Sequence, residues 1–170
     1  MHMRTNRISV RRDVVGYALL EALVAVIVAA VGFIGAARMQ TLGMSLGNSA
    51  QSRQKATLLG YQMTDRIRAN RLGFENGQYN NPTNDLTAGA TACLGGGCTP
   101  AQMAVADVSQ WAAELATALP AGTGKVCVDS TPEDGTSAAP ACDGIGNVIA
   151  VKIWWTDNVA TTKFVTVVRP

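Results

Sequence analysis

The chain has 170 residues, enough for one domain with appended segments, and a formal net charge of +2. Residues 1–16 carry four arginines and one acid, whereas the rest of the chain carries ten basic and eleven acidic residues. The basic excess therefore belongs to the N-terminal segment, and we expect no nucleic-acid partner. The only histidine is His2, so residues 17–170 lack the side chain most often used in acid–base and triad catalysis. We therefore expect neither an enzyme nor a bound cofactor.

Residues 17–37 form an apolar run that contains a single charged side chain, Glu21. As a helix the run would be about 31 Å long, which is enough to cross a bilayer. Because arginines precede it, the positive-inside rule keeps residues 1–16 in the cytoplasm and exports the chain after residue 37. A secretory signal is cut after its apolar core, whereas Gly16 lies before this core, so a cut there would leave the helix attached. An uncleaved signal anchor would explain the run but not Gly16 or Glu21.

The carboxylate of Glu21 would lie at membrane depth, where a charge costs a few kcal/mol and persists mainly when it has a partner. Cleavage after Gly16 would create such a partner, because the new α-amine of Tyr17 would lie about one helical turn from Glu21. We therefore predict cleavage between Gly16 and Tyr17.

The chain contains Cys93, Cys98, Cys127 and Cys142, all on the exported side, where disulfides persist. Of the three pairings, Cys93 with Cys98 and Cys127 with Cys142 is favoured, because each pair brackets a short, turn-rich segment. The spacings lack the C-x-x-C pairs and histidines of zinc sites, and also the C-x-x-C of redox sites. The acids between residues 129 and 143 miss the spacing of a calcium loop, so no metal is predicted.

The first half of the chain predicts one long helix from Tyr17 to about Asn70, because no proline interrupts it. Its first part, residues 17–37, is apolar throughout, and its second part, residues 38–70, is amphipathic. Residues 71–98 lose this periodicity and are predicted to form a loop.

A second helix is predicted to begin after Thr99, which forms a capping-box pattern with Gln102, and to end at Pro120. Three strands are predicted to follow and to form an antiparallel sheet on the amphipathic helix, at residues 124–128, 148–155 and 163–168. Alternation in the middle strand predicts that it is half-buried, with Trp154 and Trp155 on opposite faces. One of the two is expected in the core and the other on the outward face, where it either lies under a loop, the favoured reading, or anchors a partner. The sequence thus predicts an α+β head, residues 71–170, on a long helical stem.

These features, in this order, resemble a type IV pilin. The resemblance covers the whole chain and is most specific over residues 16–37. It implies a leader peptide, residues 1–16, that a prepilin peptidase removes after Gly16 before it N-methylates Tyr17. It also implies that Glu21 sets the axial register of the subunit in a filament.

Within that family the chain is similar to minor pilins of the PilV type. The similarity lies in the Asp65–Arg71 segment, the Cys93–Cys98 pair and the Thr99–Gln102 helix start. Two residues depart from common patterns. Tyr17 stands where Phe or Met is usual, and Arg38 stands where major pilins often have proline.

The resemblance implies a single-pass inner-membrane protein with a periplasmic head that later joins a surface pilus and supports adhesion and twitching motility. Its implied partners are the prepilin peptidase, other minor and major pilins, the inner-membrane assembly platform and a tip adhesin. A minor pseudopilin of a type II secretion system shares the leader, the cut site and Glu21, so it stays an alternative. A DNA-binding module is a further alternative, in which the stem arginines would contact phosphates.

Overall fold

The computed structural model describes residues 14–82, 93, 97–157 and 160–169, with the backbone alone at residues 14–16. The first 13 residues of the predicted leader lie outside the described residues. The chain divides into two compact units, residues 1–46 and residues 47–170.

Helix α1 (Val14–Ala69) agrees with the predicted long helix. No proline occurs in it, and its residues up to Leu46 belong to the first compact unit. From Gly47 onward the helix belongs to the second unit, where Met63 and Ile67 are fully buried.

A short helix, α2 (Arg71–Glu75), follows directly, so the prediction of a loop from residue 71 is wrong over these five residues. The side chain of Asn70 caps α2 by accepting a hydrogen bond from the backbone N–H of Gly73 at 3.2 Å. A helix this short shows no periodicity in the sequence, because it makes little more than one turn.

Helix α4 (Pro100–Ala118) confirms the predicted second helix. The hydroxyl of Thr99 accepts from the backbone N–H of Gln102 at 3.3 Å, and the Gln102 side chain accepts from the backbone N–H of Thr99 at 2.9 Å. This reciprocal capping box satisfies two N–H groups that the first turn leaves without helical partners.

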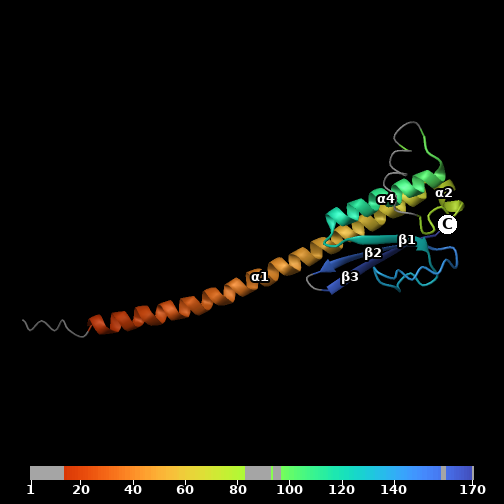
Figure 1. Ribbon diagram of the computed structural model, residues 1–170. Helices are drawn as coiled ribbons and strands as arrows, with labels where there is room; N and C mark the ends of the chain where they lie inside the picture. Colours follow the sequence, from red (N-terminus) through yellow and green to blue (C-terminus); the bar gives the residue numbers. More distant parts are fainter. Residues whose placement is uncertain (1–13, 83–92, 94–96, 158–159, 170) are drawn as a thin grey trace, which may run out of the picture. The chain divides into compact units, whose positions relative to one another are not determined.

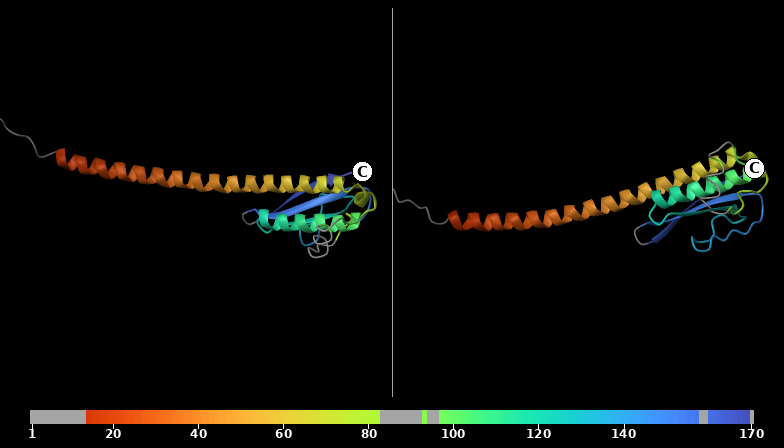
Figure 2. Two further views of the ribbon diagram at one scale, coloured as in Figure 1. Left: turned by 90° about the horizontal axis from the view of Figure 1, so that it is seen from above. Right: turned by 45° about the horizontal axis from the view of Figure 1, so that its top comes forward.

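Within the described residues, one antiparallel sheet contains strands β1 (Thr123–Val128), β2 (Ile149–Asp157) and β3 (Ala160–Val168), in the order β1-β2-β3. The predicted strands are confirmed, with ends shifted by up to three residues. Within the second unit, the C-terminal part of α1 and helix α4 cover one face of the sheet (Figures 1 and 2).

The core of the second unit lies between these two helices and the sheet. The indole N–H of Trp111 on α4 donates to the backbone carbonyl of Leu59 on α1 at 2.9 Å, which fixes the two helices side by side. Burying each large apolar side chain contributes about 1.5–3 kcal/mol. The core side chains are Ala56, Leu59, Met63, Ile67, Val108, Trp111, Leu115, Val126, Ile149, Val151, Ile153 and Trp155, among others.

Strand β2 is buried on both faces over its first seven residues, so the prediction of a half-buried strand is wrong. Trp155 belongs to the core, and Trp154 on the opposite face is also buried, with 3% of its surface exposed, which confirms that the outward tryptophan lies under a loop. The reason is a segment without regular secondary structure, residues 129–147, which crosses the face of the sheet opposite the helices (Figure 1). We call it the covering segment.

Candidate functional site

The first compact unit presents an apolar helix to its surroundings. The exposed fraction is 82% for Tyr17 and 75% for Phe33, and no side chain is buried in the most apolar window of α1. The helix is long and apolar enough to cross a membrane by length and composition, two properties that a signal sequence near an N-terminus shares. The large apolar side chains exposed here include Leu19, Leu20, Leu23, Val26, Ile27, Val31, Phe33, Ile34 and Leu42.

Gly16, Tyr17 and Glu21 all lie in the first two turns of α1. Tyr17 and Glu21 are four residues apart, so they lie on the same face of the helix, and both are exposed. Glu21 has no ion-pair partner among the described residues. The carboxylate therefore stands alone on an apolar surface, where a partner from outside this unit would stabilise it.

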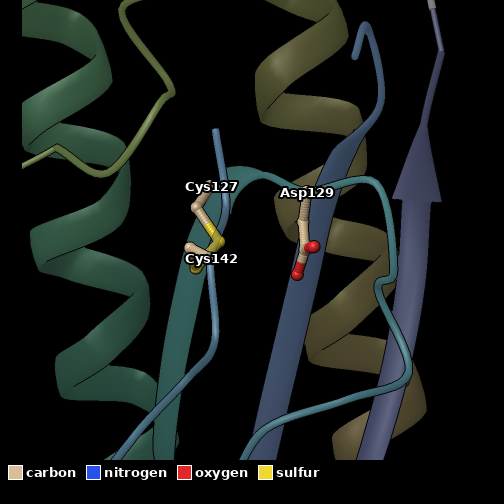
Figure 3. A group of neighbouring side chains, drawn as sticks. All are labelled: Cys127, Asp129 and Cys142. Carbon is tan, nitrogen blue, oxygen red and sulfur yellow. A yellow bond between two sulfur atoms is a disulfide. The ribbon is translucent and has the colours of Figure 1, made fainter. Parts of the chain in front are cut away.

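The cysteines are joined as neighbours along the chain, Cys93 to Cys98 and Cys127 to Cys142. Their Cα atoms are 4.9 Å and 6.0 Å apart, within the usual range for disulfides. The second disulfide ties the end of β1 to the covering segment, and Figure 3 shows the carboxylate of Asp129 beside it.

Cys127, Cys142 and Asp129 bring possible metal-ligand atoms within 4.8 Å of one another. Both sulfur atoms are, however, bonded to each other, and the thiolate is the form of cysteine that binds metals. The chemistry of this group therefore fits a structural cross-link rather than a metal centre.

The side chain of Lys152 lies under the covering segment and is fully buried. Its Nζ atom is 2.5 Å from the carboxylate of Asp129, which is also fully buried, and 3.0 Å from that of Asp134. It also donates to the backbone carbonyl of Pro140 at 2.8 Å. Burial by itself lowers the pKa of Lys152, but the hydrogen bonds to Asp129 and Asp134 outweigh it, so the pKa lies above its ordinary value. We call this group the Lys152 clamp.

Other acids of the covering segment are engaged with the protein itself. The Asp143 carboxylate accepts hydrogen bonds from the hydroxyl of Ser130 and from the backbone N–H of Ile145. These bonds lower the pKa of Asp143. Glu133 lies near Lys163 on β3, so the segment shows carboxylates with protein partners rather than an arrangement around a cation.

A second polar group lies where α1 meets α4. The Nη2 atom of Arg66 donates to both carboxylate oxygens of Glu114, at 2.9 Å and 3.1 Å. Tyr79 donates to the carboxylate of Asp107 at 2.5 Å, and burial together with this bond raises the pKa of Tyr79. Because Arg66 is occupied within the chain, it is a poor candidate for contacting phosphates.

Sequence reasoning missed the Lys152 clamp. The alternation of β2 placed Lys152 on a face that was expected to meet solvent, as charged residues usually do. Two signals were present: Trp154 lies on the same face, and acids occupy the segment between β1 and β2. A loop over the outward tryptophan was predicted, but nothing in the sequence identified it as the segment that brings Asp129 and Asp134 to Lys152.

The chain matches no protein-family model, and comparisons with curated proteins and with solved structures find no match.

Proposed function

We propose that this chain is a minor subunit of a type IV pilus, of the PilV type, that primes or modifies pilus assembly. The observation that carries the proposal is the exposed apolar stretch of α1, residues 17–37, whose one carboxylate, Glu21, has no ion-pair partner in the described part of the chain. In the precursor this helix would anchor the subunit in the inner membrane, with the head in the periplasm. In the filament the same surface would pack against the helices of other pilins.

The exchange of lipid for a helical bundle costs little, because both surroundings are apolar. Glu21 makes the exchange specific. After cleavage, the α-amine of Tyr17 on a neighbouring subunit would offer a positive charge, and burying the two charges together avoids the cost of burying either one alone. A single buried polar contact of this kind can fix the register between helices.

The second unit supports the same proposal. On its part of α1, Leu58 and Tyr61 are 58% and 55% exposed and lie three residues apart, on one face of the helix. A helix of a neighbouring pilin would cover these two side chains.

The architecture is also in keeping with a pilin. An apolar N-terminal helix leads into an α+β unit with an antiparallel sheet and a disulfide near the C-terminal part of the chain. A structural role follows for that unit: it would form the surface of the pilus and support adhesion and twitching motility together with other pilins.

The test is intact mass and N-terminal sequencing of the chain from sheared surface filaments and from inner membranes. The expected result is a chain in the filaments that begins at methylated Tyr17. A processed chain confined to the cell envelope would contradict a pilus subunit and favour a type II secretion pseudopilin. A chain that still begins at Met1 would contradict the prepilin proposal altogether.

A further inference from the structure

Two links, a disulfide and the Lys152 clamp, join the covering segment to neighbouring positions of the sheet. The disulfide joins Cys127, on β1, to Cys142, near the end of the segment. The Lys152 clamp, from the middle of β2, binds the segment just inside that disulfide.

Besides its contacts with Asp134, Lys152 has two contacts that are placed symmetrically in the sequence about the two cysteines. Asp129 follows Cys127 by two residues, and its carboxylate is 2.5 Å from the ammonium group. Pro140 precedes Cys142 by two residues, and its carbonyl accepts from the same ammonium group at 2.8 Å. One buried cation therefore holds the two flanks of the disulfide together.

We propose that Lys152 positions Cys127 and Cys142 for disulfide formation. Without such a contact, closing the loop between the cysteines costs conformational entropy. With it, the loop is closed by an ion pair and a hydrogen bond before the thiols react. Opening the loop would take the carbonyl of Pro140 and the carboxylate of Asp134 away from the ammonium group of Lys152, which is unfavourable for a buried charge. The proposal is independent of the function proposed above.

The chemical step itself is ordinary thiol–disulfide exchange with an oxidant such as oxidised glutathione. One cysteine thiolate attacks the glutathione disulfide, forms a mixed disulfide and releases one glutathione thiolate. The second cysteine thiolate then displaces the other glutathione. Two protein thiols are oxidised to a disulfide and one glutathione disulfide is reduced to two thiols, while Lys152 only holds the reacting groups in place.

The experiment measures the effective concentration of each cysteine pair in the folded full-length chain in detergent micelles. The protein is equilibrated in glutathione redox buffers, free thiols are alkylated, and the peptides are quantified by mass spectrometry. We expect Lys152→Met to lower the effective concentration of Cys127 and Cys142 about tenfold or more, a size typical of coupling between contacting groups. Cys93 and Cys98 should be unchanged in the same sample.

The matched control is Lys125→Met. Lys125 lies opposite Lys152 in the register of β1 and β2 and carries the same charge, but no ion pair joins it to the described part of the covering segment. We expect it to leave both cysteine pairs unchanged. An unaltered value for Cys127 and Cys142 in Lys152→Met, or an equal fall in Lys125→Met, would overturn the proposal.

Two further variants guard against indirect effects. Lys152→Met combined with Asp129→Asn removes the buried carboxylate that the single variant leaves unpaired, and the fall should persist. If Lys152→Met does not fold, as shown by near-ultraviolet circular dichroism of the tryptophans, Asp134→Asn removes one partner of Lys152. It should then lower the effective concentration about twofold or more. No fall in a folded Asp134→Asn variant would count against the proposal.

Discussion

Glu21 is an exposed carboxylate on an otherwise apolar stretch of α1, and it has no ion-pair partner among the described residues. If it pairs with the α-amine of a neighbouring subunit, Glu21→Ala should leave a membrane-inserted, folded chain that enters filaments about tenfold less often, the effect of about 1.4 kcal/mol. Immunoblots of sheared filaments against total membranes measure this ratio.

Glu75→Ala is the matched control for that variant, because Glu75 is exposed and forms an ion pair with Arg71 of its own helix at 2.7 Å. It should enter filaments as the wild type does. Normal incorporation of Glu21→Ala would remove the argument that this carboxylate sets the register.

Gly124 on β1 leaves room for the side chains of α4. A Cβ atom at this position would lie 2.3 Å from the ring of Trp111 and 2.4 Å from the Cδ1 atom of Leu115. Gly124→Ala should therefore destabilise the second unit by about 1–3 kcal/mol, the usual cost of overfilling a core. Thermal unfolding followed by near-ultraviolet circular dichroism measures the change.

Gly47→Ala is the control, because a Cβ atom there meets nothing within 4 Å and the residue lies in a helix. It should stabilise the protein by up to about 1 kcal/mol, since alanine favours helices over glycine. Equal stability of Gly124→Ala and the wild type would mean that β1 and α4 can move apart at little cost.

For single residues, the sequence predicted the helix cap at Thr99 but not the burial of Lys152. Thr99, Pro100 and Gln102 form a local pattern whose meaning depends on neighbouring residues only, and the structure confirms it. The burial of Lys152 depends on Asp129, Asp134 and a carbonyl more than ten residues away, so no local pattern reveals it.

Among the elements, helix α4 is stabilised by the capping box at its first turn. Thr99→Ala removes the hydroxyl that accepts from the backbone N–H of Gln102, so it should lower the free energy of unfolding by about 1 kcal/mol. Thermal unfolding of the full-length chain in detergent micelles tests this value. The control is Thr117→Ala in the last turn, where the hydroxyl donates to the carbonyls of Ala113 and Glu114 in its own helix. An equal loss in both variants would show that the cap itself contributes nothing.

The elements themselves were largely predictable, because each has a strong period or a strong boundary. The long helix lacks proline, and the strands are rich in β-branched residues. Helix α2 was missed because its start is set by the side chain of Asn70, which also donates to the carbonyl of Pro100 at 2.8 Å. That contact joins residues 30 positions apart, which no short window contains.

For the molecule as a whole, the α+β class and the order of the strands could be predicted, since consecutive antiparallel strands usually pair with each other. The residue of α1 at which the second compact unit begins was harder to predict. The second compact unit begins at Gly47, within the helix, because Ala56, Leu59 and Met63 contribute to its core. A loop over the outward tryptophan of β2 was predicted, but burial of both faces along the first seven residues of the strand was not, because the covering segment has no period that shows where it lies.

The stability of the second unit should fall in acid, and the covering segment should be responsible for part of the fall. The pKa of Asp134 is lowered chiefly by the hydrogen bond from Lys152 and then by that from Thr131. A carboxyl whose pKa is lowered by folding contributes stability that is fully present above its unfolded pKa of about 3.9 and is lost as the pH falls through the folded pKa. Asp134→Asn removes this contribution.

The pKa of Asp107 is shifted by folding in the opposite direction to that of Asp134, so Asp107 supplies the control. Burial raises its pKa more than the hydrogen bond from Tyr79 and the charge of Arg66 lower it, so protonation of Asp107 in acid favours the folded state. Thermal unfolding between about pH 5 and pH 2 should therefore show a shallower loss of stability for Asp134→Asn than for the wild type, and a steeper loss for Asp107→Asn. Parallel curves for all three proteins would show that neither carboxylate changes its proton affinity on folding, and the role of Asp134 in the Lys152 clamp would then be refuted.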